Sequence, residues 1–233
     1  MTYRPTYSYT VGAPLSSQGS GRVTTSRQEI VQITGAFLVL TLDFVLILYV
    51  GGLAFGIPIL GTLPLWLAVA TAATAALTAF VAHEMAHKIS AQRGGYWAEF
   101  RWAPLWLLLS VITSILGFLF AAPGATVIGG MGNPRDWART SLAGPATNLT
   151  FAVVFYAASI ATLHAGSYVF YPLLVIAFFN GWFGMFNLIP VGPLDGAKVL
   201  RWSTALWAAA FALGVIAGGF CYVSLFFYGR PLY

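Results

Sequence analysis

Two histidines and a glutamate with the spacing of a metal site lie within a single short stretch, His83-Glu84-Met85-Ala86-His87. Residues four positions apart share one face of a helix, so His83 and His87 could both bind one Zn²⁺. Glu84 lies about 100° around the helix axis from His83, where it could act as a general base on a water molecule without being a ligand. Such a short pattern also occurs by chance, so its surroundings must decide.

The composition is that of an integral membrane protein. Of 233 residues, 59% are hydrophobic and 7% are charged, whereas a soluble domain carries about 25% charged residues. The 11 basic residues are scattered singly, so membrane topology explains them better than nucleic-acid binding, and we expect no nucleic-acid partner. The lone cysteine, Cys221, excludes an intramolecular disulfide and is expected to pack in the core.

Residues 1–30 are polar and contain no apolar run. We therefore expect no cleavable signal peptide, but a mobile cytoplasmic tail before a single membrane domain over 31–233. Apolar stretches near the ~20 residues that a bilayer requires follow in this domain. They run from about Val31 to Phe55, Leu65 to Ala86, Pro104 to Ala122, Leu142 to Leu163, Phe170 to Ile189 and Trp202 to Phe227.

The basic residues favour five crossings rather than six. Arg4, Arg22 and Arg27 precede the first segment and no charge lies in the link at 56–63, so the amino terminus is expected in the cytoplasm. If 104–122 enters and leaves the membrane on one side, four later basic residues also fall inside. These residues are Arg135, Arg139, Lys198 and Arg201, and the same topology places Gly132 in the cytoplasm and Gly166 outside.

An ordinary spanning helix at 104–122 is the alternative to this re-entrant segment. Residues 121–130 are rich in Pro, Gly and β-branched types, which favours a loop or short strands. We therefore predict an all-α polytopic membrane protein. It should have about five or six transmembrane helices and a re-entrant loop or short β region after the His83 helix.

Asp195 is the strongest candidate for a third metal ligand. It ends a stretch in which Pro190 and Pro193 interrupt an apolar segment, and a carboxylate at membrane depth is costly unless it is paired or metal-bound. A turn at a helix end is the alternative interpretation of Asp195. His164 falls at the opposite membrane face and is expected to be interfacial. The complete acidic inventory is Glu29, Asp43, Glu84, Glu99, Asp136 and Asp195.

Three motifs, in this order and on separate membrane segments, resemble those of the site-2 proteases, the intramembrane zinc metalloproteases. They are His83-Glu84-x-x-His87, Gly144-Pro145-Ala146-Thr147-Asn148, and Asn187-x-x-Pro190 followed by Asp195-Gly196. The resemblance covers about 65–202, the expected catalytic core. No inserted PDZ or other soluble domain is expected.

The resemblance implies that His83, His87 and Asp195 bind one Zn²⁺ per chain and that Glu84 is the catalytic acid and base. It implies that Asn148 and Asn187 contact the substrate backbone or the developing oxyanion; for each, an interhelical hydrogen bond is the alternative. The site is expected toward the cytosolic side. No role can be assigned to Asp43, which could line a water path or bind a neighbouring helix.

The expected activity is hydrolysis of peptide bonds within transmembrane helices of other proteins, as in regulated intramembrane proteolysis. The expected partners are a transmembrane protein substrate and the lipid bilayer, in a multi-pass protein of the cell membrane; the oligomeric state is not predicted. A membrane transporter of metal ions or protons is the alternative, because intramembrane acids and histidines also mark ion paths. A scaffold that kept the fold without catalysis is a further alternative, but it would be free to lose Glu84.

Overall fold

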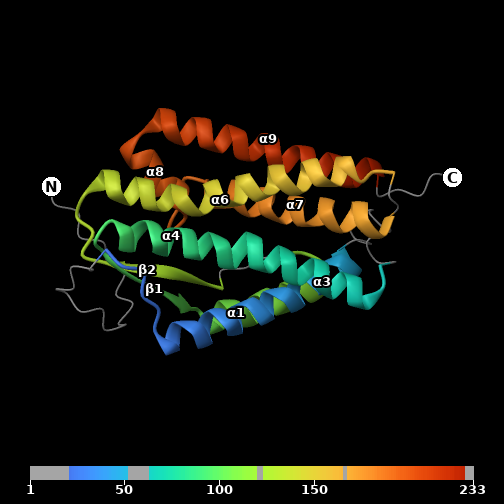
Figure 1. Cartoon of the computed structure of the whole chain (residues 1–233), viewed down its shortest axis with the longest axis horizontal. Coiled ribbons are helices and arrows are strands. Elements are labelled where there is room, and N and C mark those ends of the chain that lie inside the picture. Colours follow the sequence, from blue (N-terminus) through green and yellow to red (C-terminus); the bar gives the residue numbers. More distant parts are fainter. Residues whose placement is uncertain (1–20, 52–62, 120–122, 165–166, 229–233) are drawn as a thin grey trace.

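The computed structural model describes residues 21–51, 63–119, 123–164 and 167–228. Within these ranges, five helices are long and apolar enough to cross a membrane. They lie roughly along the long axis of the molecule, and successive ones run in opposite directions (Figure 1). The all-α polytopic fold expected from the sequence is confirmed.

The first spanning helix, α1 (Arg27–Leu46), continues through a π-helical turn, η1 (Ile47–Gly51). It begins inside the segment expected to be a mobile tail. The cause is local, because Ser26 caps the helix by accepting a hydrogen bond from the Glu29 N–H at 3.1 Å. Residues 1–20 of the expected tail, and 56–62 of the uncharged link at 56–63, lie outside the described residues.

The second spanning helix is continuous over 29 residues. It consists of α3 (Leu65–Ala76), a π-helical turn η3 (Leu77–Val81) and α4 (Ala82–Arg93). Most of the side chains that α3 buries are alanines, which lets neighbouring helices approach closely. The π-helical turn lies directly before His83, and such turns often occur at functional sites.

Two strands and a short helix follow before the third crossing. Strand β1 (Trp97–Trp102) pairs antiparallel with β2 (Gly124–Gly129), and α5 (Pro104–Ile115) lies between them in the chain. The length of α5 is about 18 Å, against the ~30 Å hydrocarbon core of a bilayer. The non-spanning interpretation of 104–122 is therefore confirmed and the ordinary spanning helix is wrong. Residues 120–122 lie outside the described part.

The sequence analysis missed β1, although its residues alternate in burial. Ala98 and Phe100 are completely buried, while their neighbours along the strand are partly accessible. This period-2 pattern in an aromatic-rich stretch is typical of a half-buried strand. Its charged residues and its place directly after a spanning helix obscure this pattern in the sequence.

The last three spanning helices are α6 (Pro134–Ala161), α7 (Ser167–Asn187) and α9 (Thr204–Tyr228), with the short helix α8 (Asp195–Trp202) before α9. Helix α6 starts before the predicted Leu142, because Asn133 caps it by accepting a hydrogen bond from the Arg135 N–H at 3.0 Å. The turn that was predicted to be external lies partly at 165–166, outside the described residues.

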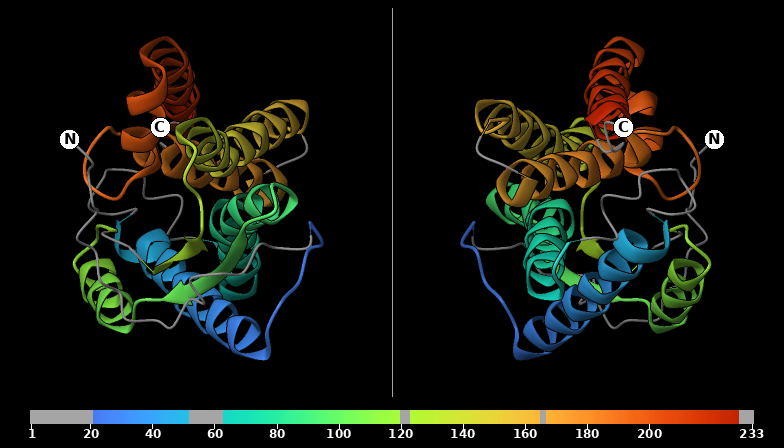
Figure 2. Two further views of the ribbon diagram at one scale, coloured as in Figure 1. Left: turned by 90° about the vertical axis from the view of Figure 1, so that its left-hand side faces the viewer. Right: turned by 90° about the vertical axis from the view of Figure 1, so that its right-hand side faces the viewer.

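Helix α4 lies in the middle of the molecule. The end views show α6 and α7 on one side of it and α1 with the sheet on the other (Figure 2). Asp43, whose role the sequence left open, is buried on α1 and accepts a hydrogen bond from the Ser110 hydroxyl of α5 at 2.6 Å. It therefore binds a neighbouring helix, one of the two roles considered for it.

A buried ion pair holds α1 against α4. Lys88 Nζ lies 2.5 Å from Glu29 Oε2, and the other oxygen of Glu29 accepts a hydrogen bond from the Phe100 N–H of β1 at 2.9 Å. Lys88 also donates to the Thr25 hydroxyl at 2.9 Å. Helices α1 and α4 and the sheet thus meet at one fully buried carboxylate.

Candidate active site

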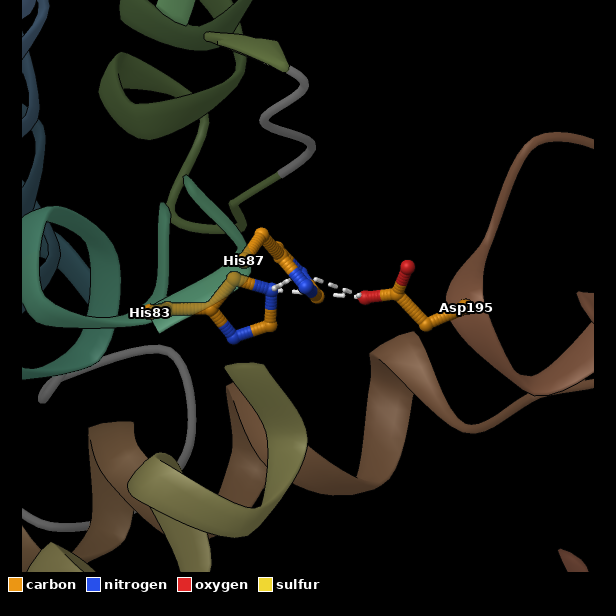
Figure 3. A group of neighbouring side chains, drawn as sticks. All are labelled: His83, His87 and Asp195. Carbon is orange, nitrogen blue, oxygen red and sulfur yellow. Dashed lines mark hydrogen bonds and ion pairs between the residues drawn. The ribbon is translucent and has the colours of Figure 1, made fainter. Parts of the chain in front are cut away.

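The structure brings His83, His87 and Asp195 together as one buried group (Figure 3). The two histidines lie one turn apart on α4, and Asp195 is the first residue of α8. The two Nε2 atoms are 2.9 Å apart, and Asp195 Oδ2 lies 3.0 Å from the Nε2 of His87 and 3.4 Å from that of His83. Among the described residues this is the only such group of metal-ligand side chains.

Hydrogen bonds to the other ring nitrogens fix the orientation of both imidazoles. His87 Nδ1 lies 2.7 Å from the Thr140 carbonyl oxygen, which can only accept. His83 Nδ1 lies 2.6 Å from Asn148 Oδ1, while the amide nitrogen of Asn148 donates to the Ala79 carbonyl at 2.9 Å. Both Nδ1 atoms therefore carry the proton in the neutral rings, and both Nε2 atoms present a lone pair.

Two lone pairs and a carboxylate oxygen that converge in a buried space repel one another unless a cation lies between them. A tetrahedral Zn²⁺ with ligands at about 2.0–2.1 Å places those ligand atoms about 3.3 Å apart. The three observed separations, 2.9, 3.0 and 3.4 Å, lie close to this value. The donor set of two imidazoles and one carboxylate is also one that catalytic zinc uses, with a coordination position left open.

The second oxygen of Asp195 has its own partner. Lys198, one turn further along α8, donates to Asp195 Oδ1 at 3.1 Å. Burial alone would raise the pKa of the Asp195 carboxyl, whereas the positive charge of Lys198 lowers that pKa. The carboxylate is therefore ionised and keeps Oδ2 directed at the histidines.

Glu84 lies beside the group without belonging to it. Its Oε2 accepts two hydrogen bonds from Thr126 of β2, one from the backbone N–H and one from the hydroxyl, both at 2.8 Å. Its Oε1 has no hydrogen-bond partner among the described residues. The arrangement orients one carboxylate oxygen and leaves the other available to take up a proton.

Two glycines allow the helices to approach this closely. A Cβ atom on Gly144 of α6 would lie 2.4 Å from His87 Nε2 and 2.6 Å from His83 Nε2. A Cβ atom on Gly196 would lie 2.0 Å from the Leu188 carbonyl oxygen. The glycine of each motif therefore makes room, at position 144 for the imidazoles and at position 196 for the chain that delivers Asp195.

The remaining predicted residues lie in different surroundings. Asn148 is fully buried, and both ends of its amide bind groups of this chain, so its hydrogen bonds favour orientation of His83 over contact with a substrate. Asn187 is half-buried at the end of α7 and donates to the Phe183 carbonyl at 3.0 Å. His164 is exposed, and 24 residues of helix and turn separate it from Thr140, about 36 Å at helical rise.

Sequence reasoning missed three residues that support the site. Lys198 had a signal, because residues three apart on a helix lie side by side and Asp195 begins one. Thr140 acts through its backbone carbonyl, which any residue type could supply, so nothing in the sequence marks it. Thr126 contacts Glu84 across 42 positions of the chain, and only the pairing of the sheet brings it there.

Comparisons with known proteins agree with this chemistry. The chain is 34% identical over 131 residues to "Putative zinc metalloprotease MJ0611" of Methanocaldococcus jannaschii, a match that covers 55% of this chain and 68% of the relative. It is 33% identical over 139 residues to "Putative zinc metalloprotease Rip3" of Mycobacterium tuberculosis, covering 58% of this chain and 31% of that relative. No family model and no solved structure matches the chain.

Proposed function

Since the chain belongs to the site-2 protease family of zinc metalloproteases, we propose that it is an intramembrane endopeptidase that cuts peptide bonds within the transmembrane helices of other proteins. The observation that carries the proposal is the buried group of His83, His87 and Asp195, with Glu84 beside it, inside a bundle of helices long enough to span a bilayer. Burial of ionisable side chains at membrane depth costs free energy, so their presence there indicates a functional site.

The residues divide the chemistry between them. His83, His87 and Asp195 would hold Zn²⁺, which supplies a Lewis acid for the scissile carbonyl and lowers the pKa of a coordinated water toward about 7. Glu84 takes the proton of the attacking water at Oε1, the oxygen that does not bind Thr126, and then delivers it to the leaving amine. Thr126 keeps the carboxylate facing the site during both transfers.

Strand β2 offers a place for the substrate backbone. Because the Thr126 N–H is directed at Glu84, the edge of β2 that turns away from β1 faces the catalytic side of α4. An extended peptide added along this edge would be bound through its backbone, next to Glu84. A substrate helix must unwind locally to pair in this way, so helices with weak helix formers near the cut are the preferred substrates.

The cytosolic side is proposed for the site because of where the basic residues lie. Of the 11 in the chain, Arg4 and Arg230 lie outside the described residues. Arg22 lies just before α1, and the other eight lie on the start of α1, the end of α4, β1, the start of α6 and α8, in the half of the bundle that contains the metal group. This distribution follows the positive-inside bias.

Cysteine labelling in sealed vesicles tests this orientation. With Cys221 replaced, a cysteine at Gly132 should react from the cytoplasmic side and one at His164 from the opposite side. Both positions are exposed, and a side chain at position 132 would meet nothing within 4 Å. Labelling of both from the same side would contradict the five-crossing topology.

A transporter of metal ions or protons receives less support. An ion path needs binding sites in series, and the described residues provide one group of metal ligands. The catalytic test is Glu84→Gln, which removes the proton acceptor and leaves all three presumed ligands in place. We expect stoichiometric zinc, unchanged crosslinking to a transmembrane substrate, and a cleavage rate lower by about 10⁴-fold or more.

Asp195→Ala serves as the matched control, because it should lose zinc and cleavage together. Cleavage by Glu84→Gln within about tenfold of the wild-type rate, below the ordinary value of general acid–base catalysis, would sink the assignment of Glu84. Ion flux in proteoliposomes that Glu84→Gln leaves unchanged would instead support the transporter.

A further inference from the structure

A cavity of about 510 Å³ lies between the C-terminal half of α4 and the N-terminal half of α6, at the end of the bundle for which the cytosolic side is proposed. Its lining contains none of the metal ligands and not Glu84. The lining residues of α4 include Ala86, Ser90 and Arg93, which lie on a different face of the helix from Glu84. The cavity is therefore separate from the side on which β2 and Glu84 meet.

One end of this cavity is cationic. Arg93 of α4 and Arg139 of α6 line it and are exposed, and neither guanidinium has a hydrogen bond or ion pair to any residue that the structure describes. One acid, Asp136, also lines it, and its carboxylate accepts a hydrogen bond from the Tyr96 hydroxyl at 2.6 Å. That hydrogen bond raises the pKa of the Tyr96 phenol, which therefore remains a donor. Two free guanidinium groups and one engaged carboxylate leave this end suited to an anion.

Small side chains line the other end of the cavity. Helices α4 and α6 run antiparallel, so Ala86 and Ala143 lie together, while Ser90 and Thr140 form a middle layer whose hydroxyl oxygens are 3.3 Å apart. Ala86 lies seven residues from Arg93, about 10 Å along the helix. The lining thus changes from charged to hydroxyl-bearing to small side chains over the length of a phospholipid headgroup and glycerol, and at the last end the Thr147 hydroxyl donates to the Ala143 carbonyl at 2.9 Å. A free phosphate ion would use the charged end alone.

We propose that this cavity binds the phosphate of an anionic phospholipid of the cytosolic leaflet. Arg93 and Arg139 bind the phosphate oxygens, Ser90 and Thr140 face the glycerol region, and the acyl chains begin at Ala86 and Ala143. Guanidinium groups suit this role because their planar donors match phosphate geometry. Basic cavities between transmembrane helices on the cytoplasmic side are known to bind such headgroups.

The site would adjoin the support of a metal ligand. Thr140 lines the cavity, and its carbonyl oxygen accepts the hydrogen bond that orients His87, at 2.7 Å. A lipid bound against Thr140 would restrict the motion of this wall without contact with the substrate. Lipid composition would then act on the enzyme from the flank of α4 opposite to Glu84.

Native mass spectrometry tests lipid binding without any need for proteolysis. Full-length, zinc-loaded Glu84→Gln protein in an uncharged detergent is titrated with phosphatidylglycerol, phosphatidylcholine or inorganic phosphate. Two arginine contacts predict a preference for phosphatidylglycerol over phosphatidylcholine of about thirtyfold. Arg93→Gln with Arg139→Gln should remove this preference, and each single variant should remove part of it.

Arg135→Gln is the matched control, because Arg135 is an exposed arginine on the same helix that does not line the cavity. It should leave the preference unchanged. Equal binding of both phospholipids would overturn the proposal, and so would an equal loss in Arg135→Gln. Inorganic phosphate that binds as tightly as phosphatidylglycerol and displaces it would reduce the cavity to a site for free anions. None of these outcomes depends on whether the protein is a protease.

Discussion

Two clusters of buried polar side chains lie on helix α4, and they differ in how their charges are balanced. In the first, Lys88 and Glu29 neutralise each other, and Thr25 and the Phe100 N–H satisfy remaining groups. In the second, the acceptor atoms of His83, His87 and Asp195 converge, and no described residue places a donor or cation between them. Burial of charge alone does not mark a functional site. Convergence of like groups that need a cation between them does.

The comparison also separates two uses of one helix. The carboxylate of Glu29 holds α1 and β1 against α4, and Lys88 lies about 100° around the helix axis from the metal ligand His87. The metal ligands can therefore be directed at an open coordination position while the other flank of α4 is fixed. Substitutions among the metal ligands should accordingly change zinc binding, and substitutions in the Lys88–Glu29 pair should change stability.

The largest effect is expected from removal of a ligand. Asp195→Ala leaves two imidazoles, and zinc affinity should fall by more than about 100-fold, because loss of a mere supporting partner already costs about 10–100-fold. Zinc measured by atomic spectroscopy after dialysis should drop from one per chain toward zero. Asp136→Ala is the control, an acid of α6 bound to Tyr96 that lies outside the metal group. Equal zinc in Asp195→Ala and in wild type would refute the ligand set.

Substitutions in the cluster of Lys88 and Glu29 should change stability instead of zinc binding. Glu29→Gln leaves the Lys88 ammonium buried without a counter-charge, and this should cost about 3–5 kcal/mol of unfolding free energy. Replacement of both partners, Glu29→Gln with Lys88→Met, should recover most of the loss, because the desolvation of both charges is then avoided. Denaturation in detergent measures the stability, and zinc per folded chain should remain at one in both variants. Failure of the double variant to recover stability would contradict this account of the pair as two charges that neutralise each other.

The same contrast explains what could be predicted from the sequence. The metal group was predictable because two of its members lie four positions apart and because an apolar chain with six acids leaves few candidates for the third. The supporting residues Thr140 and Thr126 could not be predicted. Thr140 acts on His87 through its backbone carbonyl, and Thr126 reaches Glu84 only through strand pairing. Asn148 was found, but a motif cannot say which atom its amide meets.

The Lys88–Glu29 pair was missed for a related reason. Its members lie 59 positions apart, and Glu29 was assigned to a polar tail because the residues before it have no apolar run. Composition indicates where a segment can enter a membrane. It does not show that a polar segment beside the membrane is held in place by a buried charge, which depends on the tertiary fold.

The smallest effect in this series concerns Asn148 and decides between its two proposed roles. Its amide oxygen lies 2.6 Å from His83 Nδ1, so Asn148→Ala removes the acceptor that holds the ring and its tautomer. Zinc affinity should then fall by about 10–100-fold, the usual cost of losing such a partner. Cleavage at saturating zinc should recover a large part of the wild-type rate.

Asn180→Ala is the matched control, because Asn180 is equally buried and donates to Thr78 and the Ile176 carbonyl away from the ligands. It should lose stability but not zinc affinity. If Asn148→Ala instead keeps its zinc affinity and loses turnover at every zinc concentration, Asn148 acts on the substrate or the developing oxyanion, and the geometry of the free site does not report its role in catalysis.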